Sequence, residues 1–397
     1  MKADFVVVGG GITGVCAAYH LAKRGSDVLL VERGELAPDS PLSSSGEYAK
    51  AFRSAYGKDR RMTRLCRESF RRWRQFEQEA ETELFVPSGM LVFGAQQAQT
   101  LKHWSKPENA RYALDSAAVL EAEGLSHELL HKEELVARYP QIAENAFYDH
   151  AILDKTAGLL HAQKAARAIG ALARAAGAAV WEHTTVQECV RRGENVERLV
   201  TSRGDVVAQK AIIFAAGYMN CVLAPDLRAK TRVTQHQILF MRPAELAPYA
   251  PSKFPIVVDV NRWRYVFPIH GPGITKVVDD DKFREQRIVD PREPPRTEAN
   301  DGFRTEARTF LRDYVPGLAD AAEVASNTCR YTNTVQEKYL VYRRGNAVVL
   351  SACSGHGFKN APMTALMAAG LADERVEHSS YLDKDFGYEH ADHFPSV

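Results

Sequence analysis

The sequence predicts a mixed α/β (α+β) fold built from two interlocked domains. Residues 4–33 combine an apolar run, a glycine-rich turn and a helical pattern, which is typical of a βαβ unit. Residues 233–278 alternate between apolar and polar side chains and are rich in aromatics, which favours an antiparallel sheet. The sequence shows no internal repeat, and no linker separates the two regions. With 397 residues, 45% of them hydrophobic, the chain can bury a sizeable core.

Charge and cysteine content exclude several classes of function. The chain has 51 Lys and Arg against 50 Asp and Glu, so its balanced charge argues against nucleic acid or a membrane surface as partner. The apolar run at the N-terminus is too short for a signal peptide or a membrane span, and we therefore expect a cytoplasmic protein. The six cysteines show no paired spacing, so neither a disulfide framework nor a zinc site is expected. The HADH stretch at residues 390–393 has ligand-like spacing, but we expect no metal there.

The most informative stretch is DFVVVGGGITGVCAAYHLAKRGSDVLLVER, residues 4–33. An apolar strand precedes a glycine turn, and a helical pattern and a second strand follow it. Gly9 permits a tight turn, Gly11 lets the backbone approach a pyrophosphate, and Gly14 lets the helix pack on the strand. Glu32, at the end of the second strand, is placed to accept hydrogen bonds from ribose hydroxyls. This pattern predicts a dinucleotide-binding site.

The segments that follow favour FAD over a nicotinamide cofactor. Instead of further βα repeats, which a nicotinamide domain would normally continue, the chain enters a polar loop at residues 39–57 and a charged helix at about residues 60–83. An apolar strand at residues 211–220 leads into small residues whose backbone can approach another part of the same cofactor. The sequence therefore predicts a Rossmann-like FAD-binding domain.

The other elements follow from periodicity and turn residues. Helices are expected at residues 95–103, 116–123, 132–139, 161–176 and 303–314, and from about residue 363. Further strands are expected at residues 89–94, 339–341 and 347–351, with a turn over SGHGFKNAP, residues 354–362. The expected FAD-binding domain is discontinuous, comprising residues 1–85, 145–225 and 325–397. Residues 86–144 and 226–324 form a substrate domain on an antiparallel mixed sheet.

Seven motifs spread along the chain occur together in one known family. They are VVVGGGITG, RSAYG, SGMLVFG, AGLLHAQKAARAI, FAAGYMN, TCRYT and SGHGFK. In these motifs the sequence resembles the monomeric sarcosine oxidase and N-methyltryptophan oxidase group of the D-amino-acid-oxidase-like flavoproteins. It is also similar to fructosyl amino acid oxidases and saccharopine oxidases. The resemblance covers nearly the whole chain and implies an FAD-dependent amine oxidase.

The TCRYT motif contains Cys329, and the resemblance implies that this thiol carries the flavin through a thioether to its 8α-methyl group. A thiolate is a soft nucleophile, and the adjacent Arg330 would favour that form. The alternative is an ordinary buried cysteine. Further FAD contacts are expected at Ile12, Thr13, Arg33, Ser44, Ser45, Val186, Ala216, Gly217, Gly355, Gly357, Phe358 and Lys359.

The resemblance also assigns residues to the substrate and to dioxygen. Arg53 and Lys359 match the cations that clamp the substrate carboxylate, and two cations would fix the amine over flavin N5. Lys276 matches the lysine that activates dioxygen by stabilising superoxide. Tyr265 matches an active-site tyrosine, although an aromatic side chain on a strand can simply form the pocket wall.

Three departures from the family pattern concern the substrate. Gly46 and Lys50 stand where sarcosine oxidases have a histidine and an arginine, whereas fructosyl amino acid oxidases also have a lysine at the Lys50 position. An acidic run, Asp279 to Asp281, replaces a second family histidine. Our interpretation is that the pocket admits an N-substituent larger than methyl and that the acidic run contacts a cationic or hydroxylated group on it. The alternative for the run is a solvated turn.

Together these features predict a monomeric FAD oxidase of a secondary amine, an N-alkyl amino acid. The neutral amine loses hydride to the flavin, the imine hydrolyses, and O2 is reduced to H2O2. Cations at Arg53, Lys50 and Lys359 would lower the amine's pKa and so favour its reactive neutral form. The open alternatives are a fructosyl amino acid or saccharopine/opine-type oxidase, an FAD dehydrogenase with another electron acceptor, and a flavin-loaded binding or structural subunit.

Overall fold

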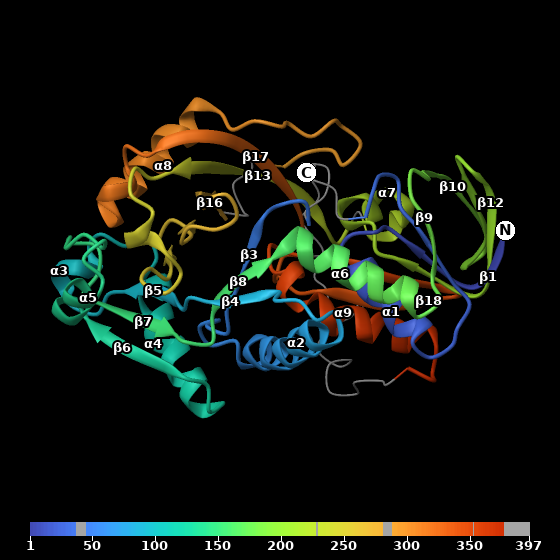
Figure 1. The fold of residues 1–397 in the computed structure, drawn as a ribbon, viewed down its shortest axis with the longest axis horizontal. Coiled ribbons are helices and arrows are strands. Elements are labelled where there is room, and N and C mark those ends of the chain that lie inside the picture. Colours follow the sequence, from blue (N-terminus) through green and yellow to red (C-terminus); the bar gives the residue numbers. More distant parts are fainter. Residues whose placement is uncertain (37–44, 228, 281–287, 352, 377–397) are drawn as a thin grey trace.

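The computed structural model describes residues 1–36, 45–227, 229–280, 288–351 and 353–376 (Figure 1). Within these ranges the strands form two eight-stranded sheets and a three-stranded sheet. The small sheet, which joins β3, β8 and β4, lies between the two large ones in Figure 1. The predicted mixed α/β class is confirmed.

The first large sheet has the order β10-β11-β12-β1-β2-β9, with β19 paired to β12 and β18 to β19. Its strands are β1 (Lys2–Val8), β2 (Val28–Val31), β9 (Ala179–Trp181), β10 (Val186–Arg192), β11 (Asn195–Thr201), β12 (Gly204–Phe214), β18 (Leu340–Arg344) and β19 (Ala347–Ser351). The β1, β12 and β19 strands are parallel, with Val8 beside Phe214 and Phe214 beside Val349. The glycine turn, FAAG and SGHG therefore all follow the carboxyl ends of neighbouring parallel strands, where ligands bind in open α/β sheets.

Helices cover one face of this sheet (Figure 1). They are α1 (Ile12–Ala22), α2 (Arg60–Glu79), α6 (Ala162–Ala175) and α9 (Gly357–Ala372). Along β1, Phe5 and Val7 pack toward these helices, whereas Val6 and Val8 belong to a second apolar cluster on the opposite face with side chains of β11 and β12. Both faces are buried, which explains why β1 reads as a continuous apolar run rather than an alternating one.

The second large sheet has the order β17-β13-β16-β15-β14-β5-β7-β6. Its strands are β5 (Met90–Gly94), β6 (His127–His131), β7 (His150–Asp154), β13 (Arg232–Arg242), β14 (Ile256–Asp259), β15 (Arg264–Val266), β16 (Thr275–Asp279) and β17 (Ala322–Asn333). The antiparallel pairing predicted for residues 233–278 is confirmed by β13, β14, β15 and β16. The α8 helix (Asp301–Tyr314) packs on one face of this second sheet, and the opposite face packs toward the small sheet.

The small sheet joins the two large ones. It consists of β3 (Ala49–Phe52), β4 (Phe85–Pro87) and β8 (Gly158–His161). The remaining helices are α3 (Ala98–Leu101), α4 (Pro107–Ala122), α5 (Lys132–Arg138) and α7 (Asn220–Leu223), with 3-10 turns at Gly217–Met219, Pro225–Leu227, Ala247–Tyr249 and Pro316–Leu318. The division into domains stays a prediction. It assigns β7, and β17 from residue 325 onward, to the FAD-binding domain, whereas both strands hydrogen-bond into the second sheet.

Several predicted helix boundaries were wrong. The α2 helix ends at Glu79 rather than near residue 83, because Glu81 adopts a left-handed φ of 48° that stops it. The α4 helix begins at Pro107 and not at residue 116, and proline at the first helical position is a start signal that the sequence analysis missed. The α3 helix is shorter than predicted, and β6 was not predicted.

The largest correction concerns α9, which begins at Gly357, inside the stretch predicted as a turn. Pro362 lies within the helix at the cost of one backbone hydrogen bond. Tertiary contacts hold the first turn: the Trp73 Nε1–H donates to the Lys359 carbonyl at 2.8 Å, and the Trp73 and Phe358 rings stack at 5.7 Å between centroids. The helix start therefore depends on packing that the local sequence does not encode.

No helix in the described part of the chain is both long enough and apolar enough to cross a membrane.

Candidate functional site

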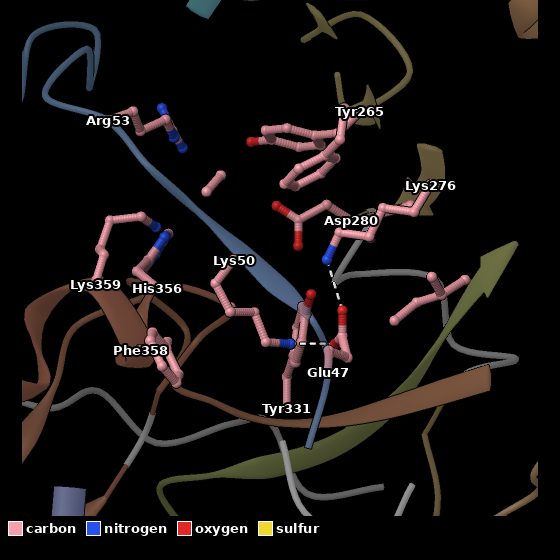
Figure 2. A pocket seen from close by; sticks show the side chains of 15 residues that line it. Glu47, Lys50, Arg53, Tyr265, Lys276, Asp280, Tyr331, His356, Phe358 and Lys359 are labelled. Atoms are coloured by element: carbon pink, nitrogen blue, oxygen red, sulfur yellow. Dashed lines mark hydrogen bonds and ion pairs between the residues drawn. The ribbon is translucent and has the colours of Figure 1, made fainter. Parts of the chain in front are cut away.

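A cavity lined largely by buried side chains lies between β3, the start of α9 and the second sheet (Figure 2). All five residues that the sequence analysis assigned to catalysis line it: Lys50, Arg53, Tyr265, Lys276 and Lys359. They come from three separate parts of the chain, so the fold brings together what the motifs indicated separately.

Arg53 follows β3 and is buried, with 3% of its surface exposed. Its Nη1 donates to the Tyr112 hydroxyl at 2.8 Å and to the Ala55 carbonyl. The guanidinium carbon lies 4.1 Å from the centroid of the Tyr56 ring. Burial by itself opposes the charge, but Tyr112 and the other facing tyrosines outweigh it and raise the pKa of Arg53 well above its usual value. Arg53 is therefore a fixed cation.

The RSAYG turn that carries Arg53 is braced by Asp154, which the sequence analysis did not predict. Asp154 lies at the end of β7, fully buried, and its Oδ2 accepts the backbone N–H groups of Ser54 at 2.7 Å and Ala55 at 2.9 Å. No local pattern identifies this role, since Asp154 is about 100 residues away along the sequence.

Lys359 approaches the same aromatic ring from α9. Its Nζ lies 5.8 Å from the Tyr56 ring centroid, so two cations face one ring. The preceding turn is anchored where the Tyr339 hydroxyl donates to the His356 carbonyl at 3.0 Å. Figure 2 shows Arg53 and Lys359 on one side of the cavity, opposite Lys276. The cavity thus has a cationic end suited to an anionic group.

Lys276 lies on β16 and is 2% exposed. Its Nζ donates to Glu47 Oε2 at 2.6 Å and to the Ala49 carbonyl at 2.5 Å, and Lys50 donates to Glu47 Oε1. The dashed lines of Figure 2 mark the two ion pairs that Glu47 makes. Burial lowers the pKa of Lys276, and Glu47 opposes that shift. Glu47 was not predicted, because only the folded chain brings Lys276 to it.

Glu47 itself is strongly ionised. Burial alone would raise its pKa, but the two lysines, Lys276 first and Lys50 second, outweigh burial and lower the pKa to about 2. Glu47 is therefore a carboxylate at any pH near neutrality, and it neutralises one of the two adjacent positive charges.

The acidic run is only partly at the cavity. Asp280 lines the cavity and is 9% exposed, so the solvated-turn alternative does not hold for it. Asp279 ends β16, where it pairs with Arg264, and is not among the lining residues. Asp281 lies outside the described residues. Among the described residues of the run, Asp280 is therefore the one placed to contact the substrate's N-substituent.

Two tyrosines form part of the cavity wall. Burial raises the pKa of Tyr265, so its hydroxyl stays protonated at neutral pH. Tyr331, which was not predicted as a site residue, stacks on His236 at 4.0 Å between centroids. The Tyr331 position, two residues after Cys329 in TCRYT, was the signal that could have identified it, since alternate residues of a strand share a face.

Cys329 lies on β17 opposite His236 and is 4% exposed. It shares its face of the strand with Tyr331, beside the cavity. Arg330, which we expected to favour the thiolate, points elsewhere: its guanidinium carbon lies 5.0 Å from the Tyr218 ring centroid. Lys50 and Lys276 both interact electrostatically with Cys329. The expected role of Arg330 and the thioether both stay predictions.

The glycine turn after β1 fits a dinucleotide. A Cβ on Gly9 would lie 2.6 Å from the Ala215 carbonyl oxygen, and a Cβ on Gly14 would lie 1.8 Å from the Gly9 carbonyl oxygen. Among the described residues, a Cβ on Gly11 would meet only Ser45 Oγ, at 3.6 Å. Packing therefore requires Gly9 and Gly14, whereas the described residues leave Gly11 uncrowded at the start of α1, where backbone N–H groups favour a phosphate.

Side chains around the turn hold it in place. Glu32 Oε2 accepts the Gly10 N–H at 2.6 Å and Oε1 accepts the Gly34 N–H at 2.8 Å, and each carboxylate oxygen has further lone pairs for a ribose hydroxyl. Ser45 Oγ accepts the Ile12 N–H at 3.1 Å. These contacts preform the turn for FAD.

The second turn, FAAG, lies against the first. Gly217 has a φ of 57°, and the Ala216 N–H donates to Asn220 Oδ1 at 2.9 Å. Asn220 is fully buried, and its Nδ2 also donates to the Leu350 carbonyl at 2.8 Å, which ties the ends of β12 and β19 together. Asn220 was not predicted, although it follows the FAAG turn directly.

The other predicted FAD contacts fall into two groups. Gly355, Phe358 and Lys359 line the cavity, and Gly357 begins α9 beside it. The second group lies elsewhere: Thr13 is in α1, Arg33 follows β2, and Val186 is in β10. Arg33 donates a hydrogen bond to the Tyr218 hydroxyl at 3.2 Å. Ser44 lies outside the described residues. In the part of the chain that the structure describes, no group of three or more His, Cys, Asp or Glu side chains is placed to hold a metal. Residues 390–393 lie outside that part.

Comparison with known proteins agrees with this geometry. Residues 4–371 match the family described as FAD dependent oxidoreductase (DAO). The chain is 31% identical over 375 residues to the peroxisomal sarcosine oxidase of Homo sapiens, covering 91% of this chain and 89% of that protein. It is 29% identical over 373 residues to the monomeric sarcosine oxidase of Bacillus sp. (strain B-0618), covering 90% and 88%.

A solved structure has the same fold. L-proline dehydrogenase from P. horikoshii superposes with a TM-score of 0.80 at 19% identity and covers 96% of both chains. With a family match over nearly the whole sequence and a preformed dinucleotide turn, this chain belongs to the FAD dependent oxidoreductase (DAO) family.

Proposed function

We propose that this protein is an FAD-dependent oxidase of a secondary amine, an N-alkyl amino acid with an N-substituent larger than methyl. The balanced reaction converts the amine, water and O2 into a carbonyl compound, a primary amine and H2O2. The observation that carries the proposal is that one cavity gathers five side chains: Arg53, Lys359, Tyr265, Lys50 and Lys276. The substrate class is also supported by relatives named sarcosine oxidase and N-methyl-L-tryptophan oxidase.

Arg53 and Lys359 bind the substrate carboxylate in this proposal. Within the described part of the chain, the hydrogen bonds of Arg53 are made by Nη1, which leaves the Nη2 side of the guanidinium for a ligand. A carboxylate held by a planar fork and an ammonium has a fixed orientation, so the amine and its adjacent C–H are also fixed. This orientation is the main contribution of the cationic end of the cavity.

The same cations control the charge of the amine. Positive groups disfavour a protonated amine, so Arg53, Lys50 and Lys359 favour the neutral form, which has the lone pair that oxidation requires. Tyr265 remains a neutral phenol, since burial raises its pKa, and it can donate a hydrogen bond to the substrate. The imine is then hydrolysed to release the products.

The residues that would hold FAD are the glycine turn at Gly9, Gly11 and Gly14 with Glu32, and the SGHG turn before α9. FAD, when bound, supplies the acceptor for the two electrons of the amine. Cys329, beside the cavity, is the proposed point of covalent attachment. Lys276, at the opposite end from the carboxylate clamp, stabilises the negative charge that develops on dioxygen as it is reduced.

The substrate preference rests on two features. Gly46 has no side chain where the related sarcosine oxidases have a histidine, and it directly precedes Glu47 of the cavity wall, which favours room for a substituent larger than methyl. Asp280 contributes a carboxylate to the cavity, which favours a cationic or hydroxylated N-substituent.

The test is a substrate panel on purified, FAD-loaded protein: sarcosine, N-carboxyalkyl amino acids and N-fructosyl amino acids, with peroxide measured in air. We expect peroxide from the larger substrates at higher kcat/KM than from sarcosine. Highest kcat/KM on sarcosine would contradict the size argument. Flavin bleaching without oxygen, but no peroxide in air, would identify a dehydrogenase instead.

A further inference from the structure

Glu47 is the one acidic side chain of the described cavity wall that bridges two lysines. Its carboxylate side chain is 3% exposed, with Lys276 on one oxygen at 2.6 Å and Lys50 on the other. A buried ion pair is costly to form, and removing one partner leaves an uncompensated buried charge. Such an arrangement sets the charge and position of a neighbouring cation.

We propose that Glu47 is a positioning residue that keeps Lys276 charged and directed at the place where dioxygen is reduced. This inference rests on the proposed function, in which Lys276 serves the oxygen reaction. Glu47 acts through Lys276 and does not itself contact substrate.

The geometry around the ammonium group supports this role. Two of its three N–H groups are directed at Glu47 Oε2 and at the Ala49 carbonyl, at 2.6 and 2.5 Å. Its Nζ also lies 4.3 Å from the Phe267 ring centroid. The Glu47 and Ala49 oxygens on one side and the Phe267 ring on another restrict the Lys276 side chain to one direction. Of these three contacts, Glu47 supplies the only charged one.

The electrostatic surroundings make the role of Glu47 specific. Several titratable groups face Lys276: Glu47, Lys50, Cys329, Tyr331, His270 and Asp280. They come from β3 and the residues before it, from β17, from the connection after β15 and from the cavity wall. Burial and the Lys50 charge lower the pKa of Lys276, and Glu47 and Cys329 raise it. His270 stays neutral near pH 7, because burial and Lys276 lower its pKa to about 4.

Covalent attachment of FAD would increase the dependence on Glu47. A Cys329 sulfur in a thioether has no negative charge, so it could no longer favour the ammonium form of Lys276. Glu47 would then be the principal anion acting on that lysine. Without it, the pKa of Lys276 falls further and the neutral amine, which cannot stabilise a developing anion, becomes populated at lower pH.

The experiment compares Glu47→Gln with the unmodified enzyme in the two half-reactions. The neutral amide keeps the size of the side chain and removes its charge. We expect reoxidation by O2 at pH 8 to slow by about tenfold or more, and the pH above which it declines to move down by about one unit or more. Anaerobic reduction by substrate should slow less than reoxidation does, since Lys276 loses its anionic partner directly, whereas Arg53 and Lys359 lie across the cavity from Lys276 (Figure 2).

Four further variants isolate the effect. Lys276→Met should slow reoxidation at every pH, and the double variant with Glu47→Gln should be no slower than Lys276→Met alone. Glu47→Asp keeps the charge and should restore most of the reoxidation rate. Glu77→Gln is the matched control: Glu77 is also buried, but it accepts the backbone N–H groups of Leu84 and Phe85 away from the cavity, and its variant should reoxidise normally.

A second readout does not depend on turnover. In protein labelled with [ε-¹³C]lysine, the Lys276 resonance, assigned by its loss in Lys276→Met, reports the charge of that lysine. Its titration should move to lower pH in Glu47→Gln and stay unchanged in Glu77→Gln. If Glu47→Gln does not fold, Glu47→Asp carries the test, with a smaller shift in the same direction.

The outcomes separate this inference from the proposed function. Normal reoxidation and an unchanged Lys276 titration in Glu47→Gln would overturn the role of Glu47. Normal reoxidation in Lys276→Met would instead overturn the assignment of Lys276 to the oxygen reaction, on which the inference rests.

Discussion

The guanidinium of Arg53 lies 4.1 Å from the centroid of the Tyr56 ring, and the same ring faces the ammonium of Lys359 at 5.8 Å. An aromatic face attracts cations and so can hold two of them near each other when no anion is present. The Tyr56 ring thus prepares the carboxylate clamp before the substrate arrives.

Two variants of Tyr56 separate the role of its ring from that of its hydroxyl. Within the described residues, the buried Tyr56 hydroxyl makes no hydrogen bond. Tyr56→Phe should therefore leave KM for an amino-acid substrate nearly unchanged, whereas Tyr56→Leu should raise it roughly 3- to 30-fold, the range of one or two cation–π contacts. Steady-state kinetics with the acid and with the matching amine that lacks the carboxylate provide the measurement. Equal effects of both variants would argue against a role for the ring.

Two glycines of the FAD turn should respond differently to alanine. Gly11→Ala adds a Cβ that, among the described residues, meets only Ser45 Oγ at 3.6 Å, so the protein should fold with a Tm close to that of the flavin-free parent but lose affinity for FAD. Gly14→Ala places its Cβ 1.8 Å from the Gly9 carbonyl oxygen and should prevent correct folding. Thermal denaturation and FAD titration distinguish the two. Unchanged FAD affinity in Gly11→Ala would exclude a pyrophosphate at this position.

The flavin of the native protein should remain with the polypeptide after acid precipitation. In Cys329→Ser the yellow colour should move to the supernatant, because a hydroxyl is a much weaker nucleophile than a thiolate. Cys189→Ser, on β10 and away from the cavity, is the matched control and should keep its flavin. Mass spectrometry of the flavin peptide identifies the attachment site, and attachment at another cysteine would contradict the assignment.

The ionisation of Glu47 should make part of the stability depend on acid pH. Burial alone raises the pKa of Glu47, but Lys276 and Lys50 lower it from 4.5 to about 2. A folded-state pKa below the unfolded value gives a stabilisation that is complete above about pH 4.5 and lost as the pH falls toward about 2. The Tm advantage of the parent over Glu47→Gln should therefore shrink between pH 6 and pH 3. A constant difference over that range would contradict the depressed pKa.

The local parts of the fold and site were predictable from the sequence. The βαβ fingerprint depends on glycines at fixed spacing, and packing requires Gly9 and Gly14 as expected. The five residues assigned to catalysis share one cavity, to which β3 and the residue after it, the β15–β16 pair and the start of α9 each contribute side chains. The sequence could not identify Glu47 or Asp154, since their partners lie far away in the chain.

Tertiary contacts also decide two other features. Arg330 follows Cys329 directly, but neighbouring residues of a strand point to opposite faces, and Lys50 and Lys276, which are distant in sequence, interact electrostatically with the thiol. The start of α9 before Pro362 depends on Trp73, which belongs to α2. In both cases contacts between distant parts of the chain determine a feature that the local sequence does not predict.

The central claim is that FAD and a carboxylate-bearing amine meet in the cavity between Arg53 and Lys276. Its most direct test is to mix FAD-loaded protein with an N-alkyl amino acid under anaerobic conditions and record the flavin absorbance. The account predicts complete bleaching, and recovery with one equivalent of peroxide when air is admitted. Protein that cannot bind FAD, or bound FAD that no such amine reduces, would contradict it.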